Sequence, residues 1–500
     1  MYEDVLLAES QYGEEGITQV QALAKALLAP GSADDLYNTP GGSLTMQSLE
    51  GMLVDLTLKA TDFTLYQDIN KNKAFSTVEE FDQQIGLGIN DGGFVGQLEN
   101  PEFRDPDFLK QIAIVKYMSE GWTVGDVAEA TNTIIDQRTR SQRSAMNRLL
   151  RNLDRAFYTG NSTWVGKSFD GLAKIISDSS SDQIYDMRGG DVSMNTFNLI
   201  GQLITEGNGH PENAKIYVSP AGVQNLHKII EAGAASTGDR KIVEMGNAGI
   251  KIGGKISGIM TAYGEMVPRM DKILGIEFES KGVPKYYNNT SKVWVEGATS
   301  DKAPSMPALS IANNATLTGS LFAAATVRPS AVKYSYRVCA RNAYGRSVAC
   351  AAVESTSVIA ASGGVTLTIT PAAGDAGSKT PECFEIYSEQ VSGSGVFRYL
   401  TTVEVDSTNP LAAVTYADKN LYIPGTSRMY IIDQTTAGED RVLAFSQLLP
   451  IHNTDLAKTF RGTQGLINLY GVLKPYKPNV LVEIRNIGVD QSNPNLFNTI

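Results

Sequence analysis

The segment of this chain that comes nearest to a catalytic motif is the glycine- and lysine-rich run Gly249–Ile256. It has the spacing G-x-x-x-x-G-K, with which a P-loop wraps the phosphates of a nucleotide. A P-loop also needs Ser or Thr after the lysine to hold magnesium, and here that position is Ile256. No long apolar strand leads into the run. We therefore expect a glycine-rich β-turn, with nucleotide binding through Lys255 as the last of the alternatives.

The histidines do not suggest a catalytic or metal site. His210, His227 and His452 are not at metal-ligand spacing from one another, and none has an acid at a diagnostic interval. His210 precedes Pro211 in an expected turn, and His227 lies beside apolar residues. The sequence also lacks a G-x-S-x-G nucleophile elbow. We predict no catalytic, cofactor-binding or metal-binding residues, no cofactor and no enzymatic activity.

Three cysteines, Cys339, Cys350 and Cys383, lie in one short stretch without a Cys-x-x-Cys pair. Cys339 and Cys350 are equidistant from Tyr344–Gly345. If a hairpin closed symmetrically there, the two thiols would face each other across the strands. Free thiols are expected in a reducing cytoplasm, and a disulfide formed after release from the cell is the alternative.

Composition indicates a folded chain of several compact units, with 500 residues of which 42% are hydrophobic. The net charge of -11 argues against a dedicated nucleic-acid binder, which needs a basic surface, but it permits a container for DNA. No apolar run is long enough to span a membrane. The N-terminus Met1–Asp4 is acidic and does not resemble a secretory signal, so we expect the protein to fold in a cytoplasm.

The N-terminal part of the sequence indicates an arm followed by an extended excursion. Residues 1–60 are expected to be an arm with helices at 17–28 and 46–58. Within 61–120, strands are expected at Leu65–Ile69, Thr77–Phe81 and Gln111–Met118. The glycine-, proline- and acid-rich run Gly86–Pro106 between them is too irregular for a compact core, so we expect it to project outward. A two-stranded excursion has too little core to be stable alone. We therefore predict that it packs on a neighbouring copy of the chain.

A long helix is predicted over 133–158, where apolar residues recur at three- and four-residue intervals. Six arginines occupy much of its remaining surface: 138, 140, 143, 148, 151 and 155. Asp136 and Asp154 share the helix, which is unlike a nucleic-acid-binding face. We expect salt bridges between subunits, or contact of Arg148 and Arg151 with the acidic loop at 99–107.

The C-terminal two thirds indicate an α/β region interrupted by a β-sandwich. Over 191–300 we expect a helix capped by Ser193, a strand at Ile216–Val218, a helix from Pro220 and short strands from Ile242 to Phe278. Residues 301–435 carry no convincing helix and alternate like sandwich strands. Residues 443–488 return to mixed α/β patterning and end in a strand, Val480–Ile484, that needs an existing sheet. This return is the reason for treating the sandwich as an insertion.

The order of these parts resembles the major capsid proteins of tailed phages, which share the Hong Kong 97 fold. Four segments carry the resemblance, and each is similar to one part of that family. Gly93–Glu99, leading into the strand Ile112–Tyr117, resembles the extended loop. Leu153–Asn161 resembles the end of the spine helix. Phe169–Leu172 resembles the link between the peripheral and axial domains, and Ile216–Pro220 resembles the strand–helix step of the axial domain.

The sandwich segment Tyr336–Ser347 resembles a fibronectin type III or immunoglobulin-like hairpin. The resemblance therefore implies an α+β capsid fold with an inserted all-β, immunoglobulin-like sandwich. Its parts would be the N-terminal arm and helices at 1–60, the extended loop at 61–120, the peripheral domain with the spine helix at 121–190 and the axial domain at 191–300. The inserted sandwich would occupy 301–435, and 436–500 would return to the axial and peripheral domains.

The implied function is self-assembly, as hexamers and pentamers, into the icosahedral head that encloses the phage genome. The implied location is the virion, with assembly in the cytoplasm of the host bacterium. The implied partners are other copies of the chain, a scaffold, a prohead protease, portal and decoration proteins and the packaged DNA, without a membrane. Leu7–Glu9 is a candidate protease site. The residues for the lysine–asparagine crosslink of one relative cannot be matched here.

Two other classes of protein remain as alternatives. An encapsulin-type nanocompartment shell has the same fold but encloses enzymes. A phage-associated adhesin or receptor-binding protein would use the immunoglobulin-like sandwich to bind a glycan or receptor, and would be monomeric or a small oligomer. Particle size separates the adhesin from the two shells, and packaged DNA separates the phage capsid from the encapsulin.

Overall fold

The computed structural model describes residues 59–88, 94–100, 103–131, 136–236, 243–246, 249–252, 256–288, 290–324, 327–375, 377–436, 438–458 and 460–489. For 230–252 only the backbone is described. These residues belong to one compact unit, Thr57–Thr131 with Asp136–Ile500. The helices expected at 17–28 and 46–58, the candidate protease site Leu7–Glu9 and Gly93 lie outside the described residues.

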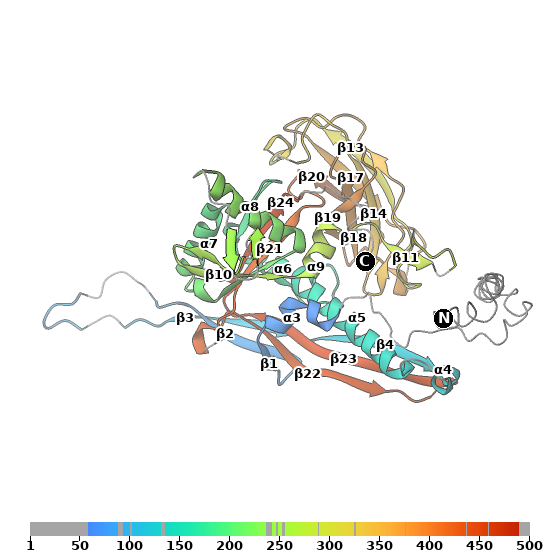
Figure 1. Cartoon of the computed structure of the whole chain (residues 1–500), viewed down its shortest axis with the longest axis horizontal. Helices are drawn as coiled ribbons and strands as arrows, with labels where there is room; N and C mark the ends of the chain where they lie inside the picture. The colour runs from blue at the N-terminus through green and yellow to red at the C-terminus, as the bar shows by residue number, and fades with distance from the viewer. Residues whose placement is uncertain are drawn as a thin grey trace, which may run out of the picture. The chain divides into compact units, whose positions relative to one another are not determined.

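A four-stranded sheet carries the long helix. Its strand order is β1 (Lys71–Lys73), β22 (Leu443–Asp455), β23 (Gly462–Pro475) and β4 (Lys116–Gly125). Helix α5 (Gln137–Thr159) lies along β4 and β23, and the short helix α4 (Asp126–Ala130) follows β4 (Figure 1). The buried face of α5 consists of apolar residues at helical spacing: Ala145, Leu149, Leu150, Leu153 and Phe157. The side chain of Asp136 caps the helix by accepting from the amide of Thr139. The predicted long helix is confirmed over the described residues.

A six-stranded mixed sheet forms the second layer. Its order is β5 (Ile184–Asp186), β24 (Val482–Ile487), β21 (Ser427–Asp433), β6 (Ala214–Val218), β10 (Gly264–Met270) and β9 (Ile259–Thr261). Helices α6 (Leu172–Ser179), α7 (Met194–Glu206) and α8 (Pro220–Ser236) belong to this region. Ser193 caps α7 as predicted, because its side chain accepts from the amide of Thr196. The cores of this sheet and of the four-stranded sheet are continuous.

Two antiparallel sheets with a core of their own make the β-sandwich. One has the order β13 (Ala308–Asn314), β17 (Gly364–Thr370), β20 (Val414–Asp418). The other has β15 (Gly345–Arg346), β14 (Ser335–Asn342), β18 (Cys383–Glu389) and β19 (Phe397–Glu404), with β16 (Val353–Glu354) also on β14. Buried side chains of both sheets meet in one cluster that includes Val338, Leu367, Ile369, Phe384 and Ile386. Alternation in the sequence predicted four of these strands, β14, β17, β18 and β19, since inward-facing residues recur with a period of two.

Three hairpins stand apart from these sheets. They are β2 (Val78–Gly86) with β3 (Asp107–Ile114), β7 (Val243–Gly246) with β8 (Gly249–Ile252), and β11 (Lys285–Asn288) with β12 (Val293–Glu296). Gly249–Ile252 is therefore a hairpin strand, and β9 begins only a few residues after Ile256. A P-loop needs a helix at that point, so the described backbone does not support nucleotide binding there.

Three predictions of secondary structure are wrong. Leu65–Ile69, expected as a strand, is mostly helix α3 (Thr64–Asp68), because Leu65 and Ile69 are both buried and share one face of a helical turn. Residues 271–279, expected among short strands, form α9 (Lys272–Leu274) and a π-helical turn at Gly275–Glu279. The described residues of 443–488 contain strands and one 3-10 turn, Pro478–Val480, but no α-helix. Their long apolar runs reflect strands with extensive burial.

The predicted end of the sandwich also needs correction. The range 301–435 includes β21, whose neighbours are β6 and β24 of the six-stranded sheet. The last sandwich strand, β20, ends at Asp418. The remaining short 3-10 turns are Ala60–Asp62, Ser181–Gln183, Pro211–Asn213, Phe322–Ala324, Gly377–Lys379 and Gly438–Asp440.

Candidate assembly surfaces

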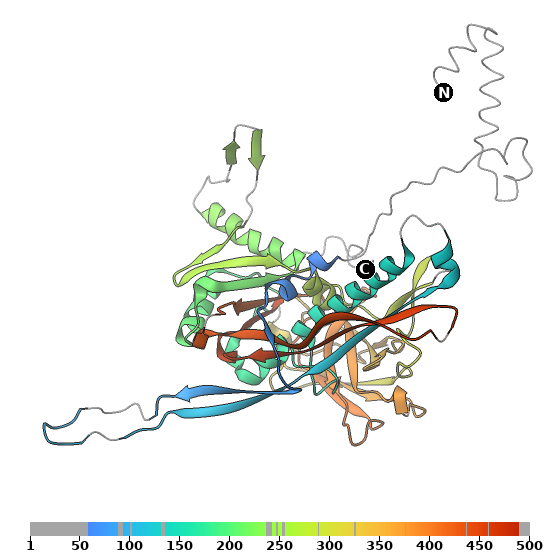
Figure 2. The same ribbon diagram turned by 90° about the horizontal axis from the view of Figure 1, so that it is seen from below.

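One face of the β2–β3 hairpin is exposed and mixes apolar with charged side chains. The register pairs Val78 with Ile114, Glu80 with Ile112, Asp82 with Lys110 and Gln84 with Phe108, so these residues share one face, and Lys110 Nζ lies 2.9 Å from Glu80 Oε2 on it. On this face Phe108 is 66% exposed, Ile112 60% and Ile114 54%. Figures 1 and 2 both show the hairpin reaching away from the sheets of its own unit. Val78, Ile112 and Ile114 form an exposed apolar group near the base of the hairpin, and Lys110 separates it from Phe108. Exposed apolar groups of this kind mark interaction surfaces.

The opposite face of the hairpin is anchored at its base. The ring of Phe81 lies 5.1 Å from that of Tyr476, and Gln83 Nε2 donates to the carbonyl of Tyr476 at 2.7 Å. Lys474 Nζ lies 2.8 Å from Glu79 Oε2. Burial alone would raise the pKa of Glu79, but Lys474 and two backbone amides lower it. The hairpin is therefore fixed on β23 while its other face remains uncovered.

Beyond the strands, the described part of the connecting loop exposes more apolar side chains. Phe94, Leu98 and Phe103 are almost fully exposed. Burying a large apolar side chain contributes about 1.5–3 kcal/mol, and leaving it in water forgoes that stabilisation. These side chains are not buried against other apolar residues of the described chain, as the sequence predicted for this excursion.

Three of the six arginines predicted on this helix form ion pairs within the described part of the chain. Arg138 pairs with Asp455 at 2.7 Å, Arg148 with Glu120 at 3.4 Å and Arg155 with Glu277 at 3.0 Å. No ion pair joins these arginines to the described residues of the 99–107 loop of the same chain. The Arg148 partner is therefore different from the one proposed from the sequence, whereas contact between subunits stays a prediction.

A cluster of buried charges connects α5, the π-helical turn and the sandwich. The fully buried carboxylate of Glu385 on β18 lies 3.3 Å from Lys281, 3.1 Å from Arg341 and 3.5 Å from Arg346. Lys281 also lies 3.6 Å from Glu277, the partner of Arg155. Burial would raise the pKa of Glu385, but the surrounding cations hold it well below its usual range. No local pattern in the sequence indicates this cluster, because its members come from distant segments.

A second buried pair consists of two carboxyls, Asp154 on α5 and Asp271 before α9. The amide of Tyr66 donates to Asp154 at 3.0 Å, and Tyr158 Oη donates to Asp271 at 2.9 Å. Burial, and the proximity of the other carboxyl, raise the pKa of Asp154 well above its usual value. Burial also raises the pKa of Asp271. The pair is therefore expected to hold a proton and to join α3, α5 and α9.

The cysteines are all free and buried. The amide of Cys350 donates to the carbonyl of Val338 at 2.9 Å, whereas Cys339 pairs in register with Glu385 on the other neighbouring strand. Cys350 therefore lies beside Val338 and not opposite Cys339, so the symmetric arrangement considered from the sequence is wrong by one residue of register. Burial raises the pKa of Cys383 to about 12, so its reactive thiolate is scarce at neutral pH.

The histidines are separate in the structure. The ring of His210 lies near two exposed acids, and His452 Nδ1 lies 3.0 Å from the carbonyl of Pro450. Among the described residues, no three His, Cys, Asp or Glu side chains come together as a metal site would require. In the same part of the chain, every helix is too short or too polar to cross a membrane.

The sequence is similar to two phage capsid proteins. It is 24% identical over 227 residues to the putative major capsid protein of Enterococcus phage phiEF24C, covering 44% of this chain and 48% of that protein. It is 26% identical over 142 residues to the major capsid protein of Staphylococcus phage K, covering 27% and 31%. The chain thus spans about half the length of the first relative and a third of the second. No family model matches the sequence.

The structure is similar to solved shells at low sequence identity. The capsid of Cyanophage P-SCSP1u matches with a TM-score of 0.43 and 8% identity, covering 92% of this chain and 98% of that chain. The holo-SrpI encapsulin complex from Synechococcus elongatus PCC 7942 matches with a TM-score of 0.39 and 8% identity, covering 93% and 99%.

Proposed function

We propose that this chain is the major capsid protein of a tailed phage, which self-assembles as hexamers and pentamers into an icosahedral shell around the genome. The observation that carries the proposal is the β2–β3 hairpin, which is fixed at its base and exposes the apolar side chains of Phe108, Ile112 and Ile114 on its other face. The similarity to two phage major capsid proteins supports the same conclusion. The hairpin would bury its face on an adjacent subunit, and repetition of that contact would close the shell.

The proposal assigns a role to each part of the described chain. The four-stranded sheet with α5 would be the peripheral domain, and the six-stranded sheet would be the axial domain. The sandwich would be an inserted immunoglobulin-like domain on the outer surface. Since β20 ends at Asp418 and β21 belongs to the six-stranded sheet, the chain would re-enter the axial domain between these two strands. Scaffold, protease, portal and decoration proteins would be the further partners.

The test is assembly of the full chain with and without an added charge in the apolar group of this face. Ile112→Asp should prevent or strongly reduce particle formation, because each interface would then bury an additional carboxylate, and the nearby Lys110 is already paired with Glu80. The matched control is Val358→Asp, which places the same charge at a similarly exposed apolar residue of the sandwich. Negative-stain microscopy and size-exclusion chromatography measure the result.

The outcomes separate the classes of protein. Shells formed by the unaltered chain and the control, but not by Ile112→Asp, support the proposal. DNA in particles isolated from infected cells would distinguish a phage capsid from an encapsulin-type shell. A chain that stays monomeric under all assembly conditions, or an Ile112→Asp variant that assembles normally, would refute the role of the hairpin.

A further inference from the structure

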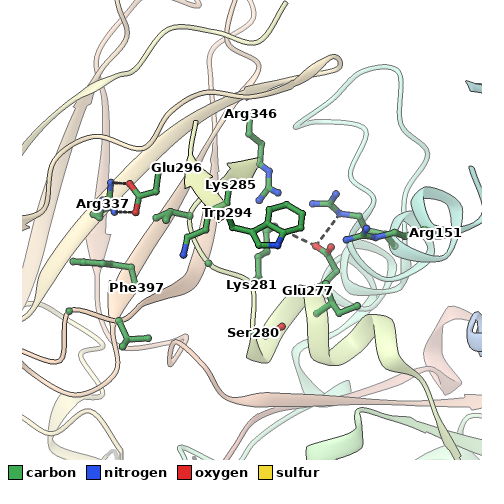
Figure 3. A pocket seen from close by; sticks show the side chains of 16 residues that line it. Arg151, Glu277, Ser280, Lys281, Lys285, Trp294, Glu296, Arg337, Arg346 and Phe397 are labelled. Atoms are coloured by element: carbon green, nitrogen blue, oxygen red, sulfur yellow. Dashed lines mark hydrogen bonds and ion pairs between the residues drawn. The ribbon is translucent and has the colours of Figure 1, made fainter. Parts of the chain in front are cut away.

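A basic cavity lies where α5, the π-helical turn, the β11–β12 hairpin and the sandwich meet. It has a volume of about 410 Å³. Its basic lining consists of Arg151, Arg155, Lys281, Lys285, Arg337 and Arg346. Only two acids, Glu277 and Glu296, line the same space. In Figure 3, Arg346 enters from the top of the view and Arg151 from the right, with the indole of Trp294 near the centre.

The two acids are already engaged. Glu296 forms a two-pronged pair with Arg337, at 2.9 and 2.7 Å. Glu277 is shared by Arg155 and Lys281. Arg151 forms no ion pair with any residue that the structure describes. Lys285 lies opposite Glu296 in the β11–β12 register and helps to lower the pKa of Glu296, whose carboxylate is already paired with Arg337. The lining therefore keeps a surplus of positive charge after its internal pairs are counted.

Glu385, behind the cavity wall, does not remove this surplus. Its carboxylate forms ion pairs with Lys281, Arg341 and Arg346 at the same time. Four cations, these three and Arg155, thus share the two carboxylates of Glu277 and Glu385. Lys281 is only 8% exposed, so water does little to balance the excess. Unbalanced charge removed from water is costly, and an anion in the cavity would lower that cost.

We propose that this cavity is an oxyanion site, which binds a phosphate or a carboxylate through Arg151, Lys285 and Arg346. Guanidinium groups suit such ligands because their planar fork donates two parallel hydrogen bonds to two oxygens. Lys285 adds a point charge from the β11–β12 hairpin. The ligand would connect α5 to the sandwich, since Arg151 and Arg346 come from these two parts. The site is built by one chain and does not depend on the proposed function.

The experiment is calorimetric titration of inorganic phosphate into the unassembled full chain, with chloride at matched ionic strength as the reference. Arg151→Gln and Lys285→Gln should each weaken phosphate binding by about tenfold or more, the range for a lost charge-assisted hydrogen bond. Both residues are exposed, so either variant should fold. The matched control is Arg143→Gln, which removes an exposed arginine from the same helix outside the cavity.

Two sources of the oxyanion are distinguished by repeating the titration on assembled particles. If a carboxylate of a second copy fills the site, particles lose the phosphate binding that the unassembled chain shows. If free phosphate is the ligand, particles and unassembled chain bind it alike. Either result supports an oxyanion site. The proposal is overturned if phosphate gives no more heat than chloride, or if Arg143→Gln weakens binding as much as Arg151→Gln. The outcome is independent of whether Ile112→Asp assembles.

Discussion

Replacing Arg328 with Met should open the β-sandwich much more often, because Asp418 would lose its buried counter-ion. The guanidinium and the carboxylate are fully buried, 2.8 Å apart. Breaking such a pair costs about 3–5 kcal/mol. Asp418 would keep hydrogen bonds from Tyr336 Oη at 2.8 Å and from the amide of Asn420 at 2.9 Å. We therefore expect a loss near the lower end, about 3 kcal/mol, which raises the open population about a hundredfold.

Thiol labelling measures this opening directly. The three cysteines of the chain are buried in the sandwich, so a disulfide-exchange reagent reaches them only when it opens. Where closing is faster than labelling, the labelling rate follows the open population. Arg328→Met should label about a hundred times faster than the unaltered chain. The control is Lys333→Met, whose partner Glu354 lies 3.7 Å away and is 58% exposed, and it should change the rate by about fivefold at most. Equal rates for the two variants would refute the reasoning.

Three further predictions concern stability, measured as the free energy of unfolding in urea. Burial raises the pKa of Asp154, so the folded chain keeps a proton that the unfolded chain releases near pH 3.8. The stabilisation that this proton gives to the folded chain is complete below that pH and is lost as the pH rises through the folded pKa, by up to about 1.4 kcal/mol per pH unit. Asp154→Asn should therefore flatten the fall of the unfolding free energy with pH. An unchanged slope in the variant would contradict the assignment of this proton to Asp154. Leu153→Ala should lower the free energy of unfolding by about 2–5 kcal/mol, because Leu153 is fully buried on the inner face of α5. A loss below about 1 kcal/mol would contradict the burial of this side chain. Ser193→Ala should cost about 0.5–2 kcal/mol through the lost cap of α7, while Ser193→Asn should cost little.

Much of the fold was predictable where a local sequence pattern is compatible with only one type of secondary structure. The apolar spacing around Leu149 and Leu153 predicted α5, and Ser193 predicted the start of α7. Alternation predicted strands such as Val365–Ile369. The prediction of a strand at Leu65–Ile69 failed because five residues contain too few repeats to distinguish a helical from a strand period. The residues that bury this segment also lie elsewhere in the chain.

The sites were less predictable than the elements. The extended two-stranded excursion of β2 and β3 was predicted, since the composition of its connecting loop could not support a core. The charge cluster was missed because Arg155, Lys281 and Glu385 are far apart in sequence and each has an ordinary local setting. The offset of Cys350 from Cys339 depends on one residue of strand register, which composition does not specify.

The central claim is that the exposed face of the β2–β3 hairpin becomes buried on another copy of the chain. Its most direct test is the labelling rate of a thiol introduced by Ile112→Cys, in unassembled chain and in particles, because the natural cysteines are buried and contribute little background. Val358→Cys on the sandwich is the matched control. We predict that Ile112→Cys labels rapidly in the unassembled chain and is protected in particles, while Val358→Cys stays accessible in both. Equal labelling of Ile112→Cys in the two states, or protection in a chain that remains single, would contradict the account.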